Sequence, residues 1–84
     1  MPSYVRIGTF CQNNFGEIMY ESKIFKFSDE SHFESIMAEG LEGLIPDFEK
    51  DLPDGWCIVD MLESIEKMDS ISETDKYITV PEQK

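Results

Sequence analysis

The stretch "YVRIGTFCQNNFGEIMYESKIFKF" (residues 4–27) decides the fold and predicts an antiparallel β-hairpin. β-Branched and aromatic side chains dominate its first eight residues, and such side chains favour strands. The loop over residues 12–17 contains two asparagines and Gly16, residue types that accept the positive φ angles of tight turns. Alternate positions of the first strand share one face, which holds Val5, Ile7, Thr9 and Cys11.

The second strand of the hairpin covers residues 18–27, but its apolar residues do not alternate regularly. Ile18 and Tyr20 occupy even positions, whereas Phe25 occupies an odd one. One extra residue in a strand moves all following side chains to the other face, and such bulges occur in antiparallel pairs. We therefore expect a β-bulge near Ser22.

A helix is predicted after the hairpin, and it begins near Ser28. Serine is a favoured N-cap residue, and Ser31 with Glu34 offers a rival capping box three residues later. Gly43 and Pro46 predict the end of this helix, because glycine follows many helices and proline does not continue them. Apolar residues recur at helical spacing and form one stripe of Phe33, Ile36, Met37, Leu41 and Leu44.

The second half of the chain gives weaker signals. Residues 46–55 predict an acidic loop with two prolines and a Pro-Asp-Gly turn. Residues 56–68 begin with the β-branched pattern of a strand but space their later apolar residues as a helix does. Both alternatives stay open for this segment, and the helix is slightly preferred. Residues 76–80 predict a short final strand.

These elements together predict an α+β fold over a single domain of residues 1–84. In this fold an N-terminal antiparallel β-hairpin packs on one helix, and a second helix or strand and a short C-terminal strand complete the structure. The chain is 40% apolar, which is enough for a core, although so short a chain buries only a modest share of its surface.

Charge is the most unusual property of the sequence. The chain carries 18 acidic and 7 basic residues, which give a net charge of −11. Residues 1–27 hold two acids and three bases, whereas residues 28–84 hold sixteen acids and four bases. All of the excess negative charge therefore follows Phe27. Such a surface would repel DNA, RNA and anionic lipid, and it would attract a basic protein surface.

The sequence also predicts where the protein works. No apolar run approaches the roughly 20 residues that a membrane-spanning helix needs. The first residues lack the basic and then apolar pattern of a secretory signal. We therefore expect a cytoplasmic protein of a bacterial host cell, with no membrane partner. In that compartment Cys11 and Cys57 are expected to be reduced thiols rather than a disulfide.

No catalytic or metal-binding motif can be defended from the residues. His32 is the single histidine, and no nucleophile stands at a supporting spacing from it. A zinc site built on Cys11, His32 and Cys57 would lack a nucleating Cys-x2-Cys pair. A calcium loop over residues 47–60 is interrupted by Pro53. We expect no enzymatic activity, no cofactor and no metal.

The acidic residues of the predicted helix and the following loop are the candidate partner-binding surface. Neighbouring like charges on a helix repel each other, and no lysine or arginine is interspersed among them in the predicted helix. Solubility alone is one interpretation, but an electropositive partner accounts better for this repulsion in so small a domain. DNA carries about one negative charge per 1.7 Å, so rigid rows of carboxylates can occupy a groove that binds DNA. The candidate residues are Glu34, Glu39, Glu42, Asp47, Glu49, Asp51 and Asp54, with Phe15 and Phe48 as apolar anchors.

Small size, strong acidity, a hairpin followed by an acidic helix and the lack of a catalytic motif resemble the phage-type inhibitors of nucleic-acid enzymes. This DNA-mimic class includes anti-restriction proteins, anti-CRISPR proteins and inhibitors of uracil-DNA glycosylase. The resemblance lies in the general character of the whole chain, and it assigns no site residue because families of the class differ in fold. It implies a non-enzymatic inhibitor that binds a basic surface of a host defence nuclease, glycosylase or CRISPR effector and there blocks or mimics nucleic acid.

Other function classes remain open from the sequence. Acidic immunity proteins and antitoxins share the same physics, with a cationic nuclease toxin as their one cognate target. A structural or regulatory module would instead assemble through the hairpin edge and the apolar helix stripe, and a homodimer through the hairpin is compatible with the sequence. Binding by such a module would depend little on salt. An enzyme would lose turnover on a single change such as His32→Ala.

Overall fold

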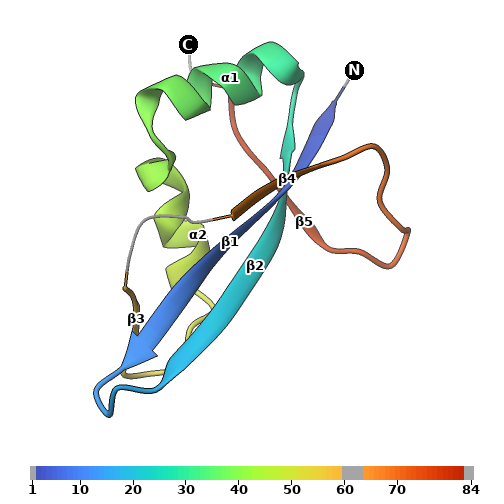
Figure 1. The fold of residues 1–84 in the computed structure, drawn as a ribbon. Helices are drawn as coiled ribbons and strands as arrows, with labels where there is room; N and C mark the ends of the chain where they lie inside the picture. Colours follow the sequence, from blue (N-terminus) through green and yellow to red (C-terminus); the bar gives the residue numbers. More distant parts are fainter. Residues whose placement is uncertain (1, 60–63, 83–84) are drawn as a thin grey trace.

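The computed structural model of the chain describes residues 2–59 and 64–82. It confirms the predicted α+β fold, with a five-stranded sheet in which β2 is flanked by β5, and β1 is flanked on its other side by β3 and β4 (Figure 1). The elements follow the order β1 (Ser3–Asn13), β2 (Ile18–Phe27), α1 (Glu30–Glu39), the 3-10 helix η1 (Leu41–Leu44), α2 (Ile45–Glu49), β3 (Trp56–Ile58), β4 (Ser64–Met68) and β5 (Tyr77–Thr79).

The hairpin of β1 and β2 pairs in one unbroken register, from Ser3 opposite Phe27 to Gln12 opposite Ile18. The expected bulge near Ser22 is therefore absent, and that prediction was wrong. An unbroken register keeps all even positions of β2 on the face opposite the core. Ile18 and Tyr20 lie on this outer face and are 63% and 50% exposed. The irregular alternation thus marks an apolar outer surface.

The core lies between the other face of the hairpin and the helices. The face of β1 that holds Val5, Ile7, Thr9 and Cys11 lies inward, because all four side chains are fully buried. Most of the predicted helical stripe packs against this face, whereas Met37 is 41% exposed. The buried cluster comprises Val5, Ile7, Phe25, Phe27, Phe33, Ile36, Leu41, Leu44, Phe48 and Val80.

The helical segment begins and ends at other residues than the sequence predicted. Asp29, rather than Ser28, is the N-cap, and its Oδ1 accepts a hydrogen bond from the backbone N of His32 at 2.8 Å. α1 ends at Gly40, whose φ of 104° suits glycine, rather than at Gly43 and Pro46. The chain then continues through η1 into α2, which starts in the segment predicted as a loop. Proline is tolerated there because the first turn of a helix needs no N–H from it.

The slight preference for a helix over residues 56–68 was wrong. The described part of this segment forms β3 and β4, which both pair antiparallel with the same edge of β1. This edge of β1 would otherwise leave a row of N–H and C=O groups unpaired, so tertiary pairing outweighs the local helical spacing. Met61 and Leu62, which helped to suggest a helix, lie outside the described residues. The predicted final strand is confirmed as β5, which runs parallel to β2.

Tyr20 crosses the outer face of the hairpin and ties three strands together. Its hydroxyl lies 2.7 Å from Ser64 Oγ in β4, so the ring passes over the intervening β1. Gly8 of β1 lies beneath it, and a Cβ at this position would overlap the Tyr20 hydroxyl. The Tyr20 ring also packs edge-on against Phe10, with centroids 5.3 Å apart. These contacts hold an exposed aromatic side chain in one place on the sheet.

Replacing Phe48 by alanine should destabilise the domain by about 3–5 kcal/mol, the usual cost of emptying a buried phenylalanine site. Phe48 is 1% exposed and packs against Phe25, with ring centroids 5.6 Å apart. The matched control is Phe15→Ala, because Phe15 is 88% exposed and should change stability by less than about 0.5 kcal/mol. Urea unfolding followed by circular dichroism measures both variants. Equal losses of stability in both would contradict this placement of the core.

Candidate partner-binding surface

Three of the predicted site residues meet around one hollow of about 390 Å³. Glu39 ends α1, Glu42 lies in η1 and Asp47 lies in α2. A fourth carboxylate, Glu82, reaches the same hollow from the chain that follows β5. We call these four residues and their cavity the acidic hollow. None of the described residues that line it is lysine or arginine, so its carboxylates face one another without compensation.

The turn at Gly40 builds the acidic hollow. It lets the chain leave α1 and bend into η1, where buried Leu41 and Leu44 hold the new turn against the core. The apolar positions point inward, so the intervening Glu42 is left exposed on the outside. On the opposite wall, Val80 is buried and its backbone N donates to the carbonyl of Lys26 at 2.9 Å. This bond places Glu82 beside the end of α1.

Glu82 was not among the predicted site residues, because it lies far along the chain from the acidic residues of the predicted helix and the following loop. The strand predicted over residues 76–80 was the one signal that could have found it. A parallel strand next to β2 brings the residues after it back to the helices, as the pairing of β5 with Ile24–Lys26 does. No local pattern in the chain indicated that β5 would pair with β2.

A second hollow of about 310 Å³ adjoins the acidic hollow and shares Ile36, Glu39 and Glu82 with it. His32 lines this second hollow, with its Nδ1 3.3 Å from Ser28 Oγ and its ring against Phe27. Its Nε2 is buried and has no hydrogen-bond partner among the described residues. A serine therefore lies near the histidine, but the described structure gives the other ring nitrogen no carboxylate to orient it.

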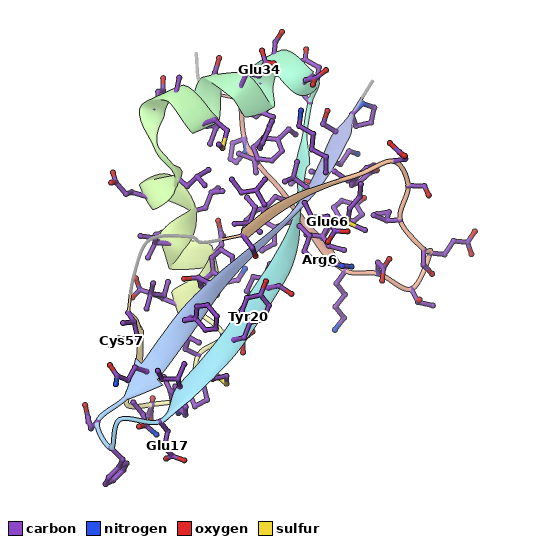
Figure 2. The ribbon with its side chains drawn as sticks, in the orientation of Figure 1. Arg6, Glu17, Tyr20, Glu34, Cys57 and Glu66 are labelled. Carbon is purple, nitrogen blue, oxygen red and sulfur yellow. The ribbon has the colours of Figure 1, made fainter. Side chains whose placement is uncertain are left out.

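The remaining predicted residues do not join the acidic hollow. Glu34 lies on the flank of α1 that faces Lys67, far from the hairpin end that carries Glu17 (Figure 2). The hydrogen bond from Lys67 Nζ to Glu30 Oε1, 2.9 Å long, raises the pKa of Lys67, and the charge of Glu34 adds to this effect. Glu49 is exposed at the end of α2, and Asp54 is exposed in the loop before β3.

The two proposed aromatic anchors occupy different places. Phe48 belongs to the core, so it cannot contact a partner, and its assignment to the surface was wrong. The sequence predicted a loop over residues 46–55, in which Phe48 could be exposed. The structure instead has α2 there, and this helix directs the Phe48 side chain into the core. Phe15 is exposed as expected, but it lies in the hairpin turn rather than beside the acidic hollow.

Asp51 belongs to a different environment, a cavity of about 520 Å³ beside the edge of β2. Of the six basic residues that the structure describes, four line this basic cavity: Arg6, Lys23, Lys50 and Lys76. The Lys23 ammonium donates a hydrogen bond to Asp51 Oδ2, which together with the nearby positive charges lowers the pKa of Asp51. The basic cavity and the acidic hollow are therefore lined by different residues, although Asp51 of the cavity and Asp47 of the hollow lie close together in the sequence.

The carboxylates of the acidic hollow are spread around its rim. Within residues 2–59 and 64–82, no group of three or more His, Cys, Asp or Glu is arranged to hold a metal ion. Both cysteines are free, and burial raises the pKa of the Cys11 thiol, with smaller contributions from Glu21 and Cys57. No described helix is both long enough and apolar enough to cross a membrane. No protein-family model, curated protein or solved structure matches the chain.

The contact of Lys23 with Asp51 should make stability depend on pH. Its effect is fully present above the ordinary aspartate pKa of about 3.9, and it is lost as the pH falls through the lower folded-state pKa. Asp51→Asn should therefore lower the thermal midpoint at pH 7 and have no effect once Asp51 is protonated. Asp54→Asn, which removes a carboxylate without an ion pair in the described structure, is the control. An NMR titration placing the Asp51 pKa at or above its ordinary value would disprove the effect.

Proposed function

We propose that the protein is a small acidic, non-enzymatic inhibitor that binds the basic nucleic-acid-binding surface of a defence nuclease or CRISPR effector. The observation that carries this proposal is the acidic hollow, where carboxylates from α1, η1, α2 and the segment after β5 surround one cavity. The partner is a basic protein, and bound inhibitor blocks the position that nucleic acid would take. No reaction and no cofactor are part of the proposal.

The electrostatics of the chain favour fast association with such a partner. A net charge of −11 on 84 residues attracts a positively charged groove over a distance that salt shortens. Ion pairs neutralise Glu30, Asp51 and Glu66, whereas the four carboxylates of the acidic hollow have no ion pair among the described residues. No described cation therefore competes with a basic partner for the carboxylates of the hollow.

The position of these carboxylates also favours affinity. Glu39, Glu42 and Asp47 stand on helical turns that the buried leucines and Phe48 hold against the core. A surface that is ordered before binding loses less entropy when the complex forms. Apolar contacts usually provide the centre of a tight interface, and Val80 and Pro81 line the hollow together with the charged residues.

Reversal of the acidic hollow should abolish capture of the partner. The variant Glu39→Lys, Glu42→Lys, Asp47→Lys is compared with the wild type in pull-downs from nuclease-treated bacterial lysate at about 0.15 M salt. Like charges across an interface cost several kcal/mol, so binding should fall by about a hundredfold or more. DNA added as competitor should release the partner from the wild type.

The matched control is Asp54→Lys, Asp69→Lys, Glu73→Lys, which makes the same change in net charge at exposed positions outside the hollow. It should retain most of the binding. Equal loss in both variants would show that total charge rather than the hollow is recognised. Capture that persists unchanged in the hollow variant would refute the proposal. A captured nuclease toxin with one cognate active site would instead identify an immunity protein that uses the same surface.

A further inference from the structure

Part of one edge of β2 has no partner strand among residues 2–59 and 64–82. β5 pairs only with Ile24, Phe25 and Lys26, and no other strand of the described chain pairs with this side of β2. The edge over residues 18–23 therefore presents unpaired backbone groups to solvent. Such an edge is a template for pairing with another strand unless charge, proline or a bulge protects it. Here the register is unbroken, the segment contains no proline, and its two charged residues, Glu21 and Lys23, have opposite signs.

The orientation of the backbone shows which residues carry the free groups. The carbonyl of Lys26 accepts the N–H of Val80 on the β5 side, whereas the carbonyl of Glu17 accepts the N–H of Asn13 on the β1 side. Backbone groups alternate sides along an antiparallel strand, so even positions face outward. Ile18, Tyr20 and Ser22 consequently offer their N–H and C=O groups at the open edge.

A second copy of the chain fits this edge in one register. Antiparallel pairing of two β2 edges requires even residues to face even residues. With Tyr20 opposite Tyr20, Ile18 faces Ser22 and Glu17 faces Lys23. A shift of two residues in either direction would place Glu17 opposite Glu21 or Glu21 opposite Glu21. Like charges directly opposite each other destabilise a sheet, so charge complementarity selects the symmetric pairing on Tyr20.

The surroundings of the edge also suit a second copy. The pairing brings the hairpin turn of each copy, with Glu17 and the exposed Phe15, to the end of the other copy's open edge. There lies the basic cavity, which Ser22 and Lys23 border together with Lys50 and Lys76. The hairpin belongs to the first 27 residues, which lack excess negative charge. Mutual repulsion between two acidic chains is therefore weakest at this edge.

We propose that the protein forms a homodimer in which β2 pairs antiparallel with β2 of a second copy, with Tyr20 on the two-fold axis. Glu17 of each copy then faces Lys23 and the basic cavity of the other. The outer face continues across the interface, where the two Tyr20 residues lie opposite each other, each with its ring directed away from the axis over Gly8 of its own copy toward Ser64. The acidic hollow lies on the helices and is not part of the interface.

Cysteine cross-linking tests the register. In a Cys57→Ser background, which removes the exposed thiol, Ile18→Cys combined with Ser22→Cys should give a disulfide-linked dimer on mild oxidation. The paired Cα atoms would be about 5.5 Å apart, within the range of a disulfide. Ile18→Cys alone and Ser22→Cys alone should not cross-link, because each residue is then about 13 Å from its own copy across the axis.

Sedimentation equilibrium tests the dimer itself. The wild type should dimerise reversibly, and Ser22→Pro should be monomeric over the same concentrations, because it removes an outward N–H that no described strand uses. A wild type that stays monomeric, or single-cysteine variants that cross-link as fast as the pair, would overturn the proposal. The cysteine variants decide the matter if Ser22→Pro fails to fold. The charge reversal of the acidic hollow should leave the dimer intact, so this proposal and the proposed inhibition can fail separately.

Discussion

Every other feature of the molecule depends on the continuous pairing of β1 with β2. Side chains alternate along a strand, so one register assigns each residue of the hairpin to the core or to the outer face. The odd positions hold Val5, Ile7, Phe25 and Phe27, which are fully buried and form the floor on which the helices pack. A slip by one residue would move these four side chains to the solvent-exposed face. The loss of their burial would be costly, so the apolar side chains specify the register without a bulge.

The acidic hollow is a consequence of how the helices cover that floor. Apolar residues at positions 33, 36, 41, 44 and 48 all belong to the core, and they reach it from α1, η1 and α2 rather than from one continuous helix. The chain turns at Gly40 and then passes from η1 directly into α2. Three of the outward positions between the buried ones are the acidic residues Glu39, Glu42 and Asp47, and this path of the chain brings their carboxylates to one hollow. The shape of the hollow therefore follows from core packing. Its negative charge does not, because core packing does not require acidic residues at these outward positions.

Local patterns predicted those parts of the fold in which neighbouring residues determine the structure. The hairpin, the two alternating faces of β1, most of the helical stripe and β5 followed from alternation, turn residues and helical spacing. Residues 56–68 were misassigned because their partner, the edge of β1, lies about fifty positions earlier in the chain. Phe48 was taken for a surface anchor because the proline and acidic residues around it suggest a loop. In the structure its ring packs against Phe25 in the core, a contact between residues far apart in the chain. Glu82 joined the site through β5, a contact that no local pattern contains.

The separation of charge in space is sharper than the separation along the sequence. Arg6, Lys23 and Lys67 make ion pairs with Glu66, Asp51 and Glu30, so three of the six described cations neutralise acids near the sheet. The carboxylates of the acidic hollow receive no such partner in the described structure, although repulsion among them works against folding. Lysines placed at exposed positions of α1 would have relieved this repulsion without disturbing the core. The proposed basic partner accounts for a surface that keeps this repulsion while four of the six described cations line a separate cavity. Solubility alone does not account for it, because a mixture of charges would also provide solubility.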